Sequence, residues 1–108
     1  MNLATLLAQA GSRWDTQAGA ISMPIYQTAT FRHPGLGQST GFDYSRTLNP
    51  TRLALEEAIA AAEGGVRASA FGSGLAALDC VMRLFQPGDR IVVTEDLGFD
   101  PHRIAGDQ

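Results

Sequence analysis

One stretch of this chain has the residue types and the order of a phosphate-binding turn. An apolar run at 66–71 is followed by Gly72-Ser73-Gly74, and an apolar stripe at helical spacing begins at Leu75. A strand, a glycine turn and a helix in that order leave backbone N–H groups free at the helix N-terminus, where the helix dipole also favours an anion. We therefore predict a phosphate-binding site at this turn. A lone Gly-Ser-Gly can equally be a plain tight turn, and it matches neither the Walker lysine loop nor the full dinucleotide fingerprint.

The basic and sulfur-containing side chains limit the chemistry that the chain can perform by itself. All eight basic residues are arginines, so the chain contains no lysine. The single cysteine, Cys80, excludes an intramolecular disulfide and argues against a zinc site built on thiolates. No histidine stands at a recognisable spacing from Cys80, which we expect to be a small core residue and not a nucleophile. His33 and His102 have no evident partner in the sequence, and we expect ordinary surface residues there.

Length and charge exclude several classes of protein. The chain has 108 residues, 44% of them hydrophobic, which suits one small globular domain. Its net charge of -3 provides no basic field to attract nucleic acid or an anionic membrane surface. No apolar run approaches the roughly 18 to 20 residues that span a bilayer, and the N-terminus lacks the layout of a secretory signal. We therefore expect a soluble, cytoplasmic protein that binds neither nucleic acid nor membrane.

A helix is predicted ahead of the glycine turn. Asn49 can cap its free N–H groups, Pro50 suits its first turn, and Gly64-Gly65 ends it. Arg52 and Glu56 are a possible i,i+4 pair. The expected apolar face consists of Leu55, Ala58, Ile59 and Ala62. Three glutamates lie mostly outside this face and should form a solvated surface without an acid/base role: Glu56, Glu57 and Glu63.

The glycine turn itself lies in a strand-helix-strand pattern. Residues 66–71 predict a short buried strand, residues 75–85 a helix, and residues 90–94 a second strand after the Pro87-Gly88-Asp89 turn. Such a unit makes a right-handed crossover in a parallel sheet, and ligands gather at the carboxyl ends of its strands. The predicted fold class is therefore α/β, with the glycine turn at a ligand-binding edge.

The first 48 residues show less order. Residues 2–10 predict a short amphipathic helix, which needs a partner surface because it is so short. Residues 12–48 have little helical or strand period. A compact domain rarely holds so long an irregular connection, so we interpret them as an arm that lies on another surface, most simply that of a second subunit. The apolar residues that a free arm would expose include Ile21, Met23, Ile25, Tyr26 and Phe31.

Four motifs that follow one another closely are together a more specific signal of function than the glycine turn alone. They are Tyr44-Ser45-Arg46, Asn49-Pro50-Thr51, Glu63-Gly64-Gly65 and Gly72-Ser73-Gly74-Leu75-Ala76-Ala77. Together with the stretch from Gly19 to Phe31, they resemble the Cys/Met-metabolism (transsulfuration) family of pyridoxal-phosphate enzymes over roughly residues 10 to 97. That family includes cystathionine γ-synthase, cystathionine β- and γ-lyases, methionine γ-lyase and homoserine sulfhydrylases. The resemblance does not choose among these members.

The resemblance implies a fold and a set of cofactor contacts. Residues 1–48 would form the N-terminal helix and inter-subunit arm, and residues 49–108 the truncated start of an aminotransferase-like (fold type I) cofactor-binding α/β domain. Tyr44 and Arg46 match the pair that reaches into a neighbouring subunit's site to hold the cofactor phosphate, and Gly74 and Leu75 match positions whose backbone N–H groups bind the same phosphate. The expected partner is an identical subunit in a homo-oligomer, as in a homotetramer, and no metal is expected. The implied binding residues for pyridoxal 5'-phosphate are Tyr44, Ser45, Arg46, Gly74 and Leu75.

The family's chemistry requires residues that this chain lacks. The resemblance implies a lysine that holds the cofactor as a Schiff base, an aspartate at the ring nitrogen and an arginine for the substrate carboxylate, and in the family all three lie well beyond the length of this chain. After Thr94 the family continues with Tyr-Gly-Gly, whose tyrosine stacks on the cofactor ring, whereas this chain has Gly98 at that position. Either Phe99 replaces the tyrosine or the stacking is lost, and we favour loss. Arg103 falls where some members place a substrate-contacting arginine, which is a weak match.

Two functional interpretations follow. In the first, the chain is the N-terminal fragment of an enzyme that performs β- or γ-elimination or γ-replacement on cystathionine, homoserine esters or methionine, and it is inactive by itself. In the second, it is a non-catalytic truncated product that binds phosphate or pairs with a full-length subunit. They differ over whether the reading frame continues past Gln108. An unrelated phosphate-binding domain would explain the glycine turn but not Tyr44, Arg46 and the arm.

Overall fold

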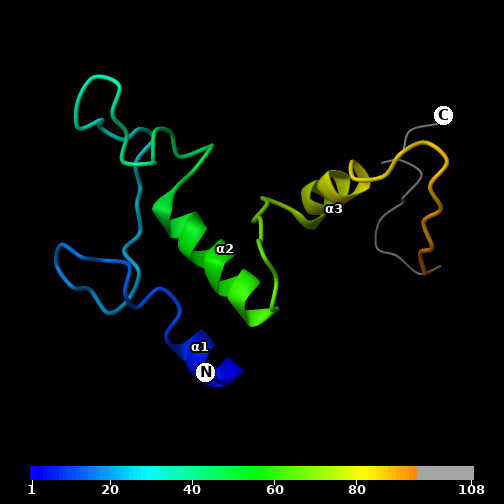
Figure 1. Ribbon diagram of the computed structural model, residues 1–108, viewed down its shortest axis with the longest axis horizontal. Coiled ribbons are helices and arrows are strands. Elements are labelled where there is room, and N and C mark those ends of the chain that lie inside the picture. The colour runs from blue at the N-terminus through cyan, green and yellow to red at the C-terminus, as the bar shows by residue number, and fades with distance from the viewer. Residues whose placement is uncertain (95–108) are drawn as a thin grey trace. The chain divides into compact units, whose positions relative to one another are not determined.

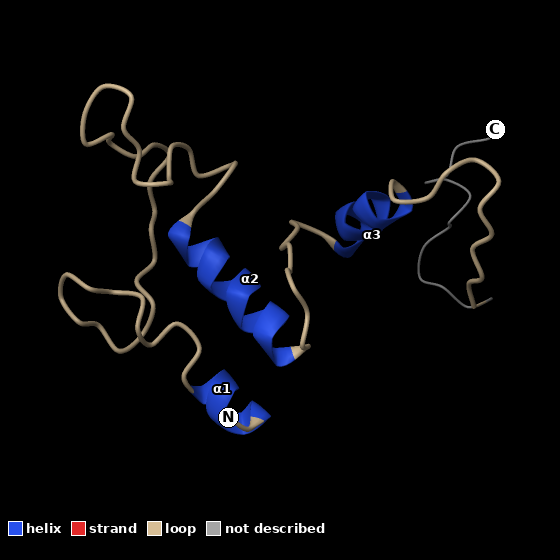
Figure 2. Ribbon diagram, in the orientation of Figure 1, coloured by secondary structure: helices blue, strands red, loops and turns tan. Residues whose placement is uncertain are grey.

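The computed structural model describes residues 1–94, which fall into two compact units. The first unit is Met1–Ala70, and the second begins at Phe71. The described residues form three helices, coloured blue in Figure 2 and labelled in Figure 1: α1 (Leu3–Ala8), α2 (Pro50–Ala62) and α3 (Gly74–Met82). No helix among these residues is long and apolar enough to cross a membrane.

Helix α1 lies within the predicted range of residues 2–10, and it packs on another surface, as expected for so short a helix. The side chain of Asn2 caps it by accepting a hydrogen bond from the Thr5 N–H at 2.8 Å. Gly11, with a φ of 76°, turns the chain away after the helix. The helix lies against α2, as Figure 1 shows within the first unit. A helix of six residues is marginal in water, so this packing is what stabilises it.

Helix α2 begins and ends as its local chemistry predicts. The Asn49 side chain accepts from the Thr51 N–H at 2.9 Å, Pro50 is the first helical residue, and Gly64 adopts a φ of 64° just past the end. The covered face shares Ala58 with the predicted one but not Leu55 and Ile59, which are 55% and 46% exposed. Instead α1 covers a small-residue face of α2. The residues that line the space between the two helices include Ala54, Ala58 and Ala61 of α2.

The two predicted strands are not formed as strands. Within residues 1–94 the backbone makes no extended ladder, and the single β contact is an isolated antiparallel bridge between Thr30 and Tyr44. Val66, expected to be buried, is fully exposed, and Val92 is nearly so. A strand requires hydrogen bonds to a neighbouring strand, and the described residues supply no such neighbour to 66–71 or 90–94. The strand-helix-strand pattern is therefore not confirmed, and only its helix is present.

Helix α3 belongs to the second unit. Ser73 caps it by accepting from the Ala76 N–H at 3.2 Å. It ends at Met82, three residues before the predicted end at 85, and the following turn is held by a hydrogen bond from the Gln86 N–H to the Asp89 carboxylate at 2.8 Å. Cys80 is exposed, so the expectation that it is a core residue is wrong for the described structure.

The segment between α1 and α2 is irregular, as predicted, but it has its own internal contacts. The carboxylate of Asp15 accepts hydrogen bonds from the N–H groups of Ala20, Ala18 and Gln17, and these hydrogen bonds hold the pKa of Asp15 below its ordinary value. Further along, the Phe31 N–H donates to the Asp43 carbonyl at 3.0 Å. The arm thus folds back on itself before it enters α2.

Candidate functional site

Tyr44 and Arg46 form one exposed unit. The Arg46 Nη2 donates a hydrogen bond to the Tyr44 hydroxyl at 2.8 Å, and the guanidinium carbon lies 5.2 Å from the centre of the tyrosine ring. Tyr44 is 37% exposed, and Arg46 is exposed as well. Within residues 1–94 the guanidinium makes no other hydrogen bond. Its remaining N–H groups are therefore available to an anionic ligand.

The turn that carries this pair is tightly closed. The Tyr44 carbonyl accepts hydrogen bonds from the N–H groups of Thr47 and Leu48, both at 3.0 Å, and from the Thr47 hydroxyl at 2.7 Å. The turn leads directly into the N-terminus of α2 (Figure 1). Both side chains of the pair thus project from a short segment whose backbone is fixed by local hydrogen bonds.

Ser45, the residue between them, is engaged inside the protein. Its N–H donates to the Ala29 carbonyl at 2.9 Å, and its hydroxyl donates to the Thr28 carbonyl. The same hydroxyl accepts from the Asn49 side-chain amide at 3.0 Å. These contacts tie the turn to the arm. The expected contact of Ser45 with a cofactor stays a prediction.

The N-terminus of α3 has the open backbone that a phosphate requires. The Ser73 hydroxyl accepts a hydrogen bond from the Ala76 N–H, and the Ser73 carbonyl accepts one from the Ala77 N–H. The N–H groups of Gly74 and Leu75 donate to no acceptor within residues 1–94. A Cβ added at Gly74 would meet no atom within 4 Å, so the space beside the turn is open. Exposed amide N–H groups at a helix start suit a phosphate.

The chemistry of these donors fits the phosphate of pyridoxal phosphate. A guanidinium and a phenol in the first unit, and two free backbone N–H groups in the second, are all groups that donate to phosphate oxygens. The structure brings Tyr44, Ser45 and Arg46 together in one turn, and it places Gly74 and Leu75 together at the start of α3. The positions Gly98, Phe99, His102 and Arg103 lie outside the described residues.

Two residues beside the turn have contacts that the sequence pattern did not predict. Arg52 donates from Nη1 to the Ser45 carbonyl at 3.2 Å and from Nη2 to the Thr47 carbonyl at 2.8 Å. Its predicted pairing with Glu56 is confirmed, with Nε and Oε1 3.7 Å apart. Glu56 is not part of a solvated surface, because its side chain is only 16% exposed and accepts from the Ala70 N–H at 2.8 Å. No periodicity signals such side-chain to backbone contacts.

The start of α2 also binds the arm. The Thr51 hydroxyl accepts from the Tyr26 N–H at 2.9 Å and donates to the Pro24 carbonyl at 3.2 Å, while the Asn49 amide donates to the Tyr26 carbonyl at 3.0 Å. Both residues therefore hold the arm, and Asn49 caps the helix at the same time.

His33 has partners that the sequence did not reveal. Its Nδ1 lies 2.6 Å from the Gln38 carbonyl oxygen, and its Nε2 lies 3.1 Å from the Asp43 carboxylate. The side chain is exposed, as expected, but it bridges two sides of the loop at 33–43. The expectation that His33 lies at the surface is confirmed, and its two partners were not evident from the sequence.

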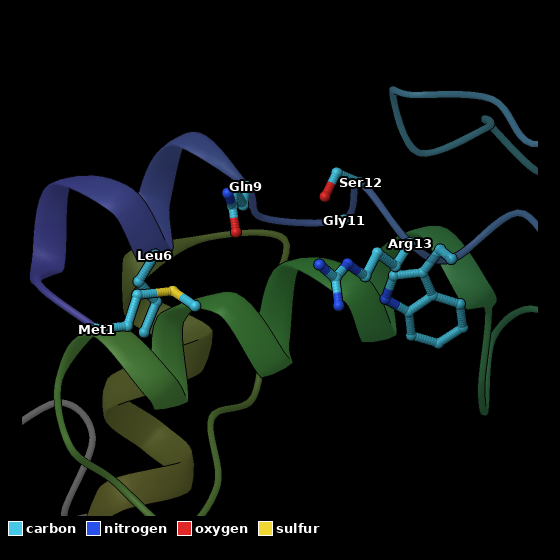
Figure 3. Close-up of a pocket in the computed structure, with 7 residues that line it drawn as sticks. Met1, Leu6, Gln9, Gly11, Ser12 and Arg13 are labelled. Carbon is cyan, nitrogen blue, oxygen red and sulfur yellow. The ribbon is translucent and has the colours of Figure 1, made fainter.

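A separate hollow lies at the N-terminal helix. It has a volume of about 300 Å³ and is shown in Figure 3 with its labelled lining residues. Its walls come from the first fourteen residues, so it includes none of the predicted phosphate-binding residues. The residues that line it are Met1, Leu6, Gln9, Gly11, Ser12, Arg13 and Trp14.

Comparison with known proteins relates the chain to one group of enzymes. The model of a family described as Cys/Met metabolism PLP-dependent enzyme matches residues 4–103. A cystathionine gamma-synthase/O-acetylhomoserine (thiol)-lyase of Bacillus subtilis is 50% identical over 100 residues, which are 93% of this chain and 27% of that protein. A cystathionine beta-lyase of Lactococcus lactis subsp. cremoris is 49% identical over 96 residues, 89% of this chain and 25% of that protein.

A solved structure agrees with these relatives. The cystathionine gamma synthase of Xanthomonas oryzae pv. oryzae, in complex with aminoacrylate and cysteine, superposes with a TM-score of 0.76 at 38% identity. The match covers 82% of this chain and 23% of that one. The chain thus spans about a quarter of the length of the proteins that it matches.

Proposed function

This chain belongs to the Cys/Met metabolism family of pyridoxal-phosphate-dependent enzymes, and from that premise we propose that it supplies part of the site that holds the cofactor's phosphate. The observation that carries the proposal is the exposed Tyr44–Arg46 pair, joined by a hydrogen bond of 2.8 Å. A guanidinium beside a phenol offers a charged donor fork and a neutral donor to one anion. The free N–H groups of Gly74 and Leu75 are a second, separate set of donors that suits a phosphate.

The bound cofactor would supply an electron sink that assists bond making and breaking at the β or γ carbon of an amino acid. We propose that the complete enzyme performs elimination or replacement at these carbons on cystathionine, homoserine esters or methionine. The relatives include both synthases and lyases, so the proposal stays at this class of reaction. This chain contributes binding and orientation, since it contains no lysine to hold the cofactor covalently.

The exposed arm supports a site shared between subunits. Ile21 and Ile25 are 80% and 75% exposed in the described structure, and burying such side chains on another surface is favourable. We propose that residues 1–48 lie on a neighbouring identical subunit of a cytoplasmic homo-oligomer. The residues from 49 onward would then begin the cofactor-binding domain.

A second candidate function follows from the absence of lysine. A chain that exists only as these 108 residues would be a non-catalytic module that binds phosphate or pairs with a full-length subunit. The two proposals predict different lengths for the open reading frame. An open reading frame that continues past Gln108 into a lysine-containing domain supports the enzyme, and a stop codon there supports the module.

The phosphate assignment can be tested by one substitution and one control in the complete enzyme. Arg46→Ala should weaken pyridoxal-phosphate binding to the apoenzyme by roughly tenfold to a hundredfold, because a hydrogen-bonded charge is lost from the phosphate. Glu57→Ala, which removes an exposed side chain without a hydrogen bond or ion pair within residues 1–94, should leave the dissociation constant unchanged. Equal retention of the cofactor by both variants would count against the assignment.

A further inference from the structure

The backbone on both sides of Arg46 is held by a single side chain. Arg52 donates to the carbonyl of Ser45 at 3.2 Å and to the carbonyl of Thr47 at 2.8 Å, the residues immediately before and after Arg46. These two bonds come from different nitrogens of one planar guanidinium. A rigid fork that spans two carbonyls fixes the orientation of the peptide groups between them.

Arg52 is itself held in place from α2. Its Nε lies 3.7 Å from Glu56 Oε1, and the same oxygen accepts from the Ala70 N–H at 2.8 Å. The side chains of Arg52 and Glu56 are only 31% and 16% exposed, so solvent screens this pair less than it screens an ordinary surface ion pair. A continuous set of contacts therefore leads from Ala70 through Glu56 and Arg52 to the turn.

We propose that Arg52 is a positioning residue for the cofactor phosphate: it holds the 45–47 backbone so that Arg46 already points toward the anion before it binds. This inference rests on the proposed function. A pre-organised donor loses less conformational freedom on binding, and small displacements of a binding group weaken its contacts strongly. Arg52 acts through the turn and does not itself contact the phosphate.

The turn's other bonds do not replace Arg52. The hydrogen bonds to the Tyr44 carbonyl close the turn at one end, and the Ser45 N–H attaches it to the arm. Neither constrains the Ser45 and Thr47 carbonyls, which are the groups that Arg52 contacts on either side of Arg46. A lysine at position 52 could reach one of these carbonyls but lacks the planar fork to hold both.

The test is a double-mutant cycle on cofactor affinity in the complete enzyme. Apoenzyme is titrated with pyridoxal phosphate, and the dissociation constant is measured for the unchanged protein, Arg52→Met, Arg46→Ala and the double variant. Arg52→Met should weaken binding about tenfold when Arg46 is present, but less than about twofold when Arg46 is already alanine. The same factor in both backgrounds would mean that Arg52 only supports the fold, and this result would overturn the proposal.

Two milder variants keep the proposal testable if Arg52→Met does not fold. Arg52→Lys retains the charge and should weaken binding about threefold or more, again only when Arg46 is present. Glu56→Gln can still accept from the Ala70 N–H but loses the charge beside Arg52, and we expect a similar dependence on Arg46. Unchanged affinity in both folded variants would contradict the proposal.

A matched arginine provides the control. Arg83 makes an i,i+4 ion pair with Asp79 at 2.9 Å, as Arg52 does with Glu56, but it contacts no backbone carbonyl of residues 44–48. Arg83→Met should therefore leave the dissociation constant unchanged. If the unchanged enzyme binds no pyridoxal phosphate, the proposed function fails. If it binds and Arg46→Ala weakens binding while Arg52→Met does not, only the role of Arg52 is overturned.

Discussion

The pairing of Tyr44 with Arg46 illustrates how two polar side chains can be exposed and yet ordered. Each stabilises the other by a hydrogen bond and by the position of the cation near the ring face. An ordered arginine binds a phosphate with less loss of rotamer freedom than one that moves freely in water. The phenol of Tyr44 therefore has two functions in our proposal: it can donate to the phosphate, and it orients the guanidinium.

Removing the Tyr44 hydroxyl should have a measurable but modest effect. Tyr44→Phe keeps the ring near the Arg46 guanidinium but removes the hydroxyl. That hydroxyl accepts from Arg46 Nη2 and is one proposed donor to the phosphate. We expect the dissociation constant of pyridoxal phosphate in the complete enzyme to rise about threefold to tenfold. Tyr26→Phe is the control, because the Tyr26 hydroxyl makes no hydrogen bond within residues 1–94. Equal changes in both variants would argue against a specific role for Tyr44.

At the scale of elements, the start of α2 is where the arm, the turn and the helix meet. Asn49 caps the helix, donates to the Tyr26 carbonyl and contacts the Ser45 hydroxyl. One side chain thus connects three segments. The free energy lost on its removal should exceed that of an ordinary cap.

Asn49→Ala should destabilise the complete enzyme by about 1 to 2 kcal/mol, the upper part of the range for a lost N-cap. Asn2→Ala is the matched control, since Asn2 caps the exposed six-residue helix α1 and makes no hydrogen bond to another segment within residues 1–94. Denaturant unfolding of both variants measures the difference. If Asn2→Ala costs as much as Asn49→Ala, the connecting role of Asn49 is wrong.

The elements also show what the sequence could and could not predict. Helix α2 was predicted because Asn49 and Pro50 act through local hydrogen bonding and φ, which need no distant partner. The strands at 66–71 and 90–94 were not confirmed, because a strand depends on a neighbour in space. The Leu55 and Ile59 stripe indicated an apolar face but not which face α1 would cover.

The contacts of the site divide in the same way. The resemblance in sequence selected Tyr44, Arg46, Gly74 and Leu75, and their exposure and free donors fit a phosphate. The contacts from Arg52 to two backbone carbonyls depend on how the turn folds over the first turn of α2, which no residue spacing encodes. Only the Arg52–Glu56 pair, set by helical spacing, could be predicted.

For the molecule as a whole, the described residues have little core of their own. Ala54 is the one buried hydrophobic side chain among residues 1–94, while Val66, Val92 and Leu36 are almost fully exposed. Burial of apolar surface is the main favourable term in folding, so these side chains favour a larger assembly that covers them.

The most direct test of the central claim is the intact mass of the denatured protein from its native source, after borohydride reduction has fixed any lysine-bound cofactor to the polypeptide. We predict a polypeptide several times heavier than the 11.5 kDa of this chain, with the added mass of a bound pyridoxyl phosphate. A mass of 11.5 kDa without that addition would contradict the enzyme and leave a catalytically silent module.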